Sequence, residues 1–167
     1  VKMNVIYSNP MKEVLLPKKR ENITSSDEDL YYTKDELKQF LELVDNLNDI
    51  KLYAMFRVLA YTGMRKGELQ ALEWSDIDFI DNTININKTL SINSEHKITV
   101  QTPKSKSSIR KISIDEETKL ILKRWKIKQK ELFFSIGTRV KKNQLCFTND
   151  ITNDYLYLNF TNDKLRK

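Results

Sequence analysis

The hydrophobic pattern of this chain changes its period once, close to Trp74, and that change limits the folds the chain can adopt. Before Trp74, apolar residues recur every three or four positions, as they do in amphipathic helices. After it, apolar and polar residues alternate on either side of the turn pair Asp81-Asn82. The alternating apolar residues are Ile77, Phe79, Ile84 and Ile86. Helices followed by a small antiparallel sheet predict an α+β fold.

Three helices are expected ahead of this change. The first begins at Thr33, because Thr33 and Glu36 have the spacing of a capping box. The second ends at Gly63, a residue suited to a helix C-cap, and the third follows directly. Their core-facing residues are expected to be Leu37, Phe40, Leu41 and Val44 in the first, Leu52, Met55, Phe56, Leu59 and Ala60 in the second, and Leu69 and Leu72 in the third.

The second half of the chain is expected to complete the sheet and add a long helix. Residues 98–100 and 112–114 have the composition of strands, so we predict a mainly helical domain with a small antiparallel three-stranded sheet. The long helix runs from Asp115 to about Phe134. Its core side is predicted to hold Ile121, Trp125, Lys128 and Leu132. After a break at Gly137, residues 151–166 are the candidate for a further helix.

Composition is that of a soluble globular protein, with 40% hydrophobic and 31% charged residues. Cys146 is the single cysteine, so it cannot form an internal disulfide, and no Cys/His cluster indicates a zinc site. We therefore expect no metal or cofactor and a reducing, cytoplasmic setting. No apolar stretch approaches the roughly 20 residues of a membrane span.

Positive charge is concentrated in one part of the sequence. Between Gln101 and Lys142 there are 13 Lys and Arg against 4 Asp and Glu, within a net charge of +6 for the whole chain. A basic segment beside a mildly acidic remainder favours a polyanion as partner. A lysine-rich solvated surface is the alternative interpretation, and charge alone does not separate the two.

Arg65 stands at the start of a helix, where the positive end of the helix dipole makes an arginine unfavourable unless an anion joins it. Glu68 lies three residues on, so both side chains share one face. One interpretation is a simple intrahelical ion pair. The other is a guanidinium that binds a phosphate, with Glu68 fixing its orientation, because the planar fork of arginine holds two phosphate oxygens at once.

The longer string LAYTGMRKGELQALEWSDID resembles the first arginine box of the tyrosine recombinases, the phage-integrase family. Members of that family carry a helix that ends in Thr-Gly, an apolar residue, the catalytic arginine and a glutamate three residues later. Leucines, a tryptophan and an Asp-Ile-Asp run follow. The matching positions here are Thr62, Gly63, Met64, Arg65, Glu68, Leu69, Leu72, Trp74, Asp76, Ile77 and Asp78.

A second string, TPKSKSSIRKISI, is similar to the family's β-hairpin that carries the catalytic lysine. By position that lysine is Lys104, and Lys106 is the competitor because a change in loop length would shift the register. The resemblance covers most of the chain and is best over residues 31–114. Four further basic residues are assigned to DNA binding: Lys66, Lys106, Arg110 and Lys111.

The resemblance implies a DNA strand-transfer reaction without a metal, in which a tyrosine forms a 3′-phosphotyrosyl bond. Arginines stabilise the negative charge of the transition state, and an acid protonates the leaving 5′-oxygen. We assign Arg65 to the transition state, Lys104 to the general acid and Glu68 to the support of Arg65. The family also implies double-stranded DNA as partner and a homotetramer on DNA.

Other family residues are not found. There is no His-x-x-Arg box, since the only histidine, His96, is followed by Lys97-Ile98-Thr99. None of the seven tyrosines has the position of the nucleophile. We therefore expect a truncated chain, with residues 1–30 as the end of a core-binding domain and linker and residues 31–167 as the first part of the catalytic domain. Such a fragment is expected to bind DNA without cleaving it.

Two alternatives to a site-specific recombinase of a mobile element remain open at this point. One is a relative that binds DNA without catalysis, and the other is a type IB topoisomerase-like domain. A basic α+β domain unrelated to either would leave both string matches to chance. The target DNA site is not encoded in these motifs.

Overall fold

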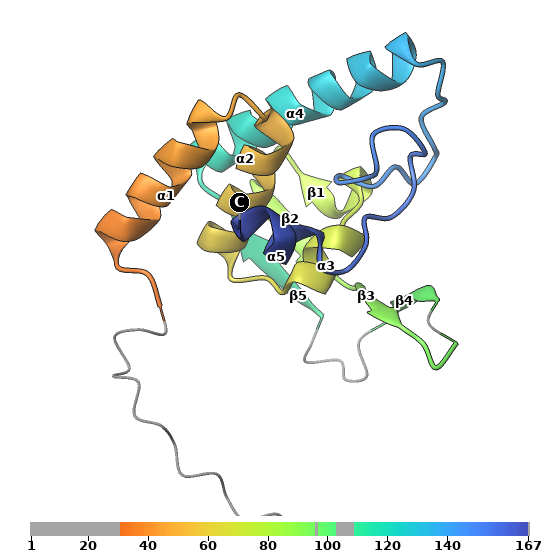
Figure 1. The fold of residues 1–167 in the computed structure, drawn as a ribbon, viewed down its shortest axis with the longest axis horizontal. Helices are drawn as coiled ribbons and strands as arrows, with labels where there is room; N and C mark the ends of the chain where they lie inside the picture. The colour runs from red at the N-terminus through yellow and green to blue at the C-terminus, as the bar shows by residue number, and fades with distance from the viewer. Residues whose placement is uncertain (1–30, 96, 103–108, 167) are drawn as a thin grey trace, which may run out of the picture. The chain divides into compact units, whose positions relative to one another are not determined.

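The computed structural model describes residues 31–95, 97–102 and 109–166. The chain divides into two units, residues 1–33 and 34–167, and the helices and strands of the described residues belong to the second. In chain order these elements are α1 (Lys34–Asn46), α2 (Ile50–Thr62), α3 (Lys66–Ala71), a 3-10 turn η3 (Trp74–Asp76), β1 (Ile77–Asp78), β2 (Thr83–Ile86), β3 (Thr89–Ile92), β4 (Ile98–Gln101), β5 (Arg110–Ser113), α4 (Glu116–Ser135) and α5 (Phe160–Leu165) (Figure 1). Within the described ranges, no helix combines the length and the apolar character needed to cross a bilayer.

The three predicted N-terminal helices are confirmed as α1, α2 and α3. At the start of α2, the Asp49 carboxylate accepts hydrogen bonds from the backbone N–H groups of Lys51 and Leu52, both at 3.1 Å. At its end, Gly63 has a φ of 61° and caps the helix in the left-handed conformation, as its residue type predicts. The turn that leads into α3 therefore begins at a fixed point.

The predicted three-stranded antiparallel sheet is formed by β1, β2 and β5, in that order. Ile84 in β2 pairs with Ile77 in β1 and with Ile112 in β5. Ile84 and Ile86 point into the core, whereas the residues between and beside them point outward, which confirms the predicted alternation.

Residues 98–101 belong to a second sheet, which corrects the prediction that residues 98–100 and 112–114 share one sheet. β4 pairs with β3 in a two-stranded hairpin, in which Leu90 faces Val100 and Ile92 faces Ile98. Figure 1 shows this hairpin standing apart from the three-stranded sheet. β3 was not predicted, because its Thr-Leu-Ser-Ile sequence follows β2 after only Asn87 and Lys88 and carries no turn signal of its own.

The core forms around α2, which packs against α1, α3 and α4. α4 confirms the predicted long helix, but Lys128 on its predicted core side is exposed. Gln129 is buried in its place, because its amide has partners there. Its carbonyl oxygen accepts from the Trp74 indole at 2.8 Å, and its NH₂ group donates to the backbone oxygens of Leu145 and Cys146 at 3.1 Å. A polar side chain in a core position was not visible in the hydrophobic pattern.

The chain after α4 returns to the core as an irregular segment with two isolated bridges, at Leu145 and Thr148. Leu145, Cys146 and Phe147 are buried there. The Cys146 N–H donates to the Leu72 oxygen at 2.7 Å, and the Cys146 oxygen accepts from the Trp125 indole at 2.7 Å. The candidate helix within residues 151–166 is present as α5.

Candidate active site

Arg65 occupies the N-cap position of α3. It therefore lies one residue before the helix, whose first residue is Lys66, and not within its first turn. The turn that carries it is held from both sides. The Thr62 hydroxyl donates to the Val58 oxygen at 2.6 Å and accepts from the Met64 N–H at 3.3 Å. The Met64 side chain is buried in the core. The backbone direction at Arg65 is therefore fixed, although its own side chain is exposed.

The Glu68 carboxylate organises the site, because four hydrogen bonds from the described residues end on its two oxygens. Oε2 accepts from the Arg65 backbone N–H at 2.8 Å, and Oε1 accepts from the Arg65 guanidinium at 3.2 Å. The Arg110 guanidinium supplies the other two, to Oε1 at 3.0 Å and to Oε2 at 2.8 Å. A carboxylate offers about four acceptor positions, so Glu68 is saturated.

The two arginines differ sharply in exposure. The Arg65 side chain is 79% exposed, the Arg110 side chain 31% and the Glu68 side chain 7%. The hydrogen bonds from Arg110, and then the N–H of Arg65, hold the pKa of Glu68 below its ordinary value, despite the opposing effect of burial. Two cations around one ionised carboxylate leave a net positive charge, and it is presented to solvent by Arg65. Such a group is suited to hold an oxyanion.

α3 sits against the β3–β4 hairpin through Gly67, the second residue of the helix. A Cβ at this position would lie 2.7 Å from the Leu90 oxygen and 2.7 Å from the Thr89 hydroxyl oxygen. Only glycine allows this approach without a shift of the strand. Gly67 thus allows the close approach of the candidate site to the β3–β4 hairpin.

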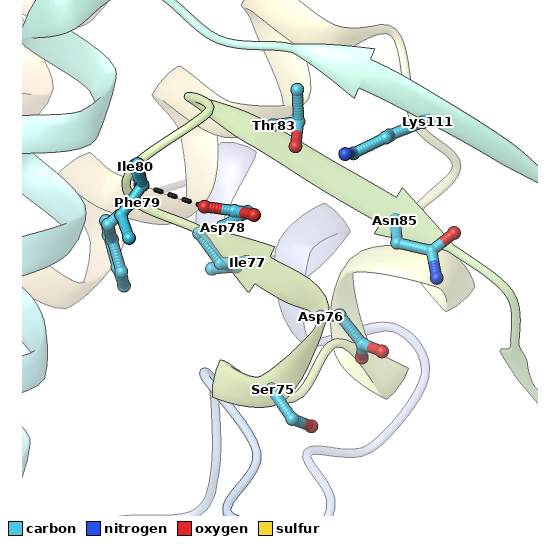
Figure 2. A pocket seen from close by; sticks show the side chains of 9 residues that line it. All are labelled: Ser75, Asp76, Ile77, Asp78, Phe79, Ile80, Thr83, Asn85 and Lys111. Atoms are coloured by element: carbon cyan, nitrogen blue, oxygen red, sulfur yellow. Dashed lines mark hydrogen bonds between the residues drawn. The ribbon is translucent and has the colours of Figure 1, made fainter.

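The other sequence-predicted DNA contacts are distributed differently. Lys66 is exposed and donates to the Asn159 side chain at 3.3 Å. Lys111 points to the opposite face of β5 from Arg110, where it lies 3.8 Å from Asp81. Figure 2 shows it beside Thr83 and Asn85, lining an open depression of about 490 Å³. Lys104 and Lys106, like His96, lie outside the described residues.

The structure therefore brings Arg65, Glu68 and Arg110 together and turns Lys111 away from them. The sequence indicated the Arg65–Glu68 pair through its spacing. The bidentate contact between Arg110 and Glu68 was missed, since 42 residues separate them and the pairing of Arg110 with Ile86 in β2 has no signal in the sequence.

Of the two tyrosines near the end of the described residues, Tyr157 contacts α3 and α5, whereas Tyr155 pairs with Thr148. The backbone oxygen of Tyr157 accepts a hydrogen bond from the Gln70 side chain in α3 at 3.1 Å. The Tyr157 ring packs edge-on against the Phe160 ring, with 5.6 Å between the ring centroids. A hydrogen bond to Asp163 raises the pKa of its phenol. Tyr155 forms an isolated bridge with Thr148.

The sequence is similar to those of bacterial integrases and recombinases. The ICEBs1 integrase of Bacillus subtilis is 38% identical over 110 residues, which cover 65% of this chain and 29% of that protein. The tyrosine recombinase XerC-like protein of Caldanaerobacter subterraneus is 28% identical over 142 residues, which cover 80% of this chain and 32% of that protein. The chain thus spans about a third of the length of these relatives.

Solved structures share the fold. The Tn1549 transposon integrase in complex with transposon right end DNA superposes with a TM-score of 0.54 at 26% identity, over 75% of this chain and 39% of that one. The XerA recombinase superposes with a TM-score of 0.58 at 23% identity, over 81% of this chain and 40% of that one.

A match to a known family confirms the resemblance that was first drawn from the arginine box and from the string TPKSKSSIRKISI. Residues 31–158 match the phage integrase family, and this range runs from just before α1 to just before α5. The chain belongs to the phage integrase family.

Proposed function

We propose that the protein built from this chain is a site-specific tyrosine recombinase that integrates or excises a mobile element. In this proposal it breaks and rejoins double-stranded DNA through a 3′-phosphotyrosyl intermediate. Residues 31–167 supply the first part of the catalytic domain, and residues 1–30 lead into it from a core-binding domain. The observation that carries the proposal is the exposed Arg65 guanidinium, held on the saturated carboxylate of Glu68.

Cleavage of a phosphodiester requires a cation that stabilises developing negative charge, and the candidate site contains one. Attack on a phosphodiester develops negative charge on the non-bridging oxygens, and Arg65 is positioned to stabilise it. Glu68 holds Arg65 by its backbone and by one guanidinium N–H, and the Arg65 side chain stays largely exposed. Lys104 is proposed as the acid that protonates the 5′-oxygen, with Lys106 as the alternative.

The type of substrate is inferred from the relatives. The ICEBs1 protein is an integrase, and the Tn1549 integrase was solved with transposon DNA. We therefore propose a mobile element as the substrate and action on the chromosome in the bacterial cytoplasm. A homotetramer as the active assembly is proposed from the family resemblance.

A nicked suicide duplex tests the function, because loss of the fragment beyond the nick traps the covalent intermediate. The complete recombinase is expected to give a protein–DNA adduct, and Arg65→Ala is expected to abolish it while binding is retained. Lys104→Ala is expected to lose the adduct and to regain it when sulfur replaces the leaving 5′-oxygen, since a thiolate needs no acid. Lys106→Ala is the matched control for that assignment.

Absence of an adduct on a cognate site that is still bound would favour a DNA-binding relative without catalysis. The 167-residue chain by itself is expected to shift duplex DNA without an adduct. A covalent product from this chain alone would contradict the assignment of the nucleophile to another part of the protein.

A further inference from the structure

Arg110 was assigned to DNA, yet its guanidinium is already committed inside the protein. Both of its terminal nitrogens donate to Glu68, at 3.0 and 2.8 Å, in the bidentate geometry that makes arginine–carboxylate pairs strong. It is less than half as exposed as Arg65. A phosphate that recruited Arg110 would have to remove it from a carboxylate that is almost fully buried.

Arg65 and Arg110 share the acceptor positions of the Glu68 carboxylate, and this sharing determines how many guanidinium donors of Arg65 remain available. Each Glu68 oxygen accepts one bond from Arg110 and one from Arg65. Arg65 therefore reaches the carboxylate with a single guanidinium N–H, and within the described residues the other four of its five donors are left for another anion. If Arg110 were absent, Glu68 would have two free acceptor positions directly beside the exposed guanidinium of Arg65.

We propose that Arg110 is a positioning residue of the recombinase: by occupying both Glu68 oxygens from β5, it keeps that carboxylate from capturing Arg65, so that Arg65 stays available to the scissile phosphate. The reaction it serves rests on the function proposed above. The arrangement itself does not, and it can be measured on this chain without DNA.

The chemical reactivity of Arg65 measures its freedom directly. Phenylglyoxal modifies exposed arginine guanidinium groups, and mass spectrometry of peptides gives the rate at each site. Arg110→Met is expected to slow the modification of Arg65 by roughly twofold to fivefold, the range that an exposed ion pair supplies. The modification rate of Arg124, an exposed arginine on α4, serves as the internal reference in each sample.

Removal of the carboxylate is the decisive second change. In the Glu68→Gln, Arg110→Met double variant, Arg65 has no ionised neighbour to close on, so its modification rate is expected to return to or above the wild-type rate. Arg110→Lys, which keeps the charge but not the fork, should fall between wild type and Arg110→Met. Circular dichroism establishes that each variant is folded, and Arg110→Lys preserves the test if Arg110→Met is not.

Strand cleavage by the complete recombinase gives the functional readout. Arg110→Met is expected to lower the single-turnover cleavage rate roughly tenfold or more, as small displacements of a catalytic group do, with a nearly unchanged Kd for DNA. The double variant is expected to cleave faster than Arg110→Met alone, a reversal that a merely structural role does not give. Arg124→Met is the matched control, expected to cleave like wild type.

Three results overturn the proposal. Unchanged Arg65 reactivity in Arg110→Met shows that Glu68 does not capture it. A double variant no more reactive than Arg110→Met indicates a structural role for Arg110. Weaker DNA binding with a salt slope reduced by about one assigns Arg110 to a direct phosphate contact. A wild-type recombinase without any adduct contradicts the proposed function instead, and the reactivity of Arg65 still decides the role of Arg110.

Discussion

Glu68 is the residue on which the candidate site depends, since donors from α3 and β5 meet on it. Its lowered pKa has a consequence for stability. The unfolded chain binds a proton at the ordinary glutamate pKa of about 4.3, whereas the folded protein resists protonation until a lower pH. The ionised form therefore stabilises the fold fully above the unfolded pKa, and this contribution is lost as pH falls through the folded pKa.

Glu68→Gln is accordingly expected to destabilise the protein by roughly 1–3 kcal/mol near neutral pH, where charged hydrogen bonds are lost. The difference in unfolding free energy between wild type and variant should be largest above the unfolded pKa of about 4.3 and should shrink as the pH is lowered below it. Urea unfolding at stepped pH measures it. A difference that stays constant as the pH is lowered would show that the charge of Glu68 contributes nothing.

At this scale the sequence predicted the pair that is local and missed the pair that is not. Arg65 and Glu68 are three residues apart, so helix geometry alone places them on one face. Arg110 reaches Glu68 because Arg110 pairs with Ile86 across two strands, and that register depends on how β5 joins the sheet. Spacing along the chain carries no information about such a register.

At the scale of the elements, the contact between α3 and β3 leaves no room for a side chain at Gly67. Gly67→Ala is expected to destabilise the protein by roughly 1–3 kcal/mol, because the added methyl group would overlap the backbone of β3. In an exposed helical position the same change would stabilise slightly, since alanine is the better helix former. Urea unfolding gives the sign. Lys66→Ala, at the preceding position, is the control, and a stabilised Gly67→Ala would show that the hairpin moves freely.

The end of α4 offers a matched pair of phenylalanines. Phe133 is fully buried and Phe134 is 90% exposed. Phe133→Ala is expected to cost roughly 3–5 kcal/mol of unfolding free energy, as buried aromatic truncations do, whereas Phe134→Ala should remain within about 0.5 kcal/mol of wild type. Thermal or urea unfolding of the two variants side by side checks this. Equal losses would mean that Phe134 is covered in solution.

The elements themselves were largely predictable, and the exceptions share a cause. Helices with an apolar face and a Thr-Gly end signal themselves in the sequence, so α1, α2 and α4 were found. β3 and Gln129 were not, because each depends on a partner elsewhere: β3 on Gly67 and β4, and Gln129 on Trp74. A residue whose place is determined by a distant group has no local pattern.

For the whole molecule, the charge count overstated the free basic surface. Several cations between Gln101 and Lys142 have internal partners. Arg110 holds Glu68, Lys126 lies over the Trp74 and Phe79 rings, and Lys141 donates to the Asn153 oxygen and to Asp154. Arg65, outside that segment, is the more exposed arginine of the site. Local charge density therefore overestimates the number of cations in this segment that are left free for a polyanion.

The thiol of Cys146, in the buried segment after α4, makes global unfolding of the protein measurable. Cys146 is fully buried, and burial raises the pKa of its thiol well above the usual range. Its backbone is tied to Leu72 and Trp125, which belong to distant parts of the chain. Since the thiolate is the reactive form, the folded protein should react very slowly with a thiol reagent.

Labelling of Cys146 is therefore expected to require unfolding of the core, and its rate should follow the free energy of unfolding. Under conditions where refolding outpaces labelling, each loss of about 1.4 kcal/mol should accelerate it about tenfold. Gly67→Ala and Phe133→Ala should then label faster in proportion to their urea-derived losses, and Phe134→Ala should label like wild type. Rapid labelling that is equal in all four proteins would instead mean that residues 144–148 detach locally while α2, α4 and the sheet stay folded.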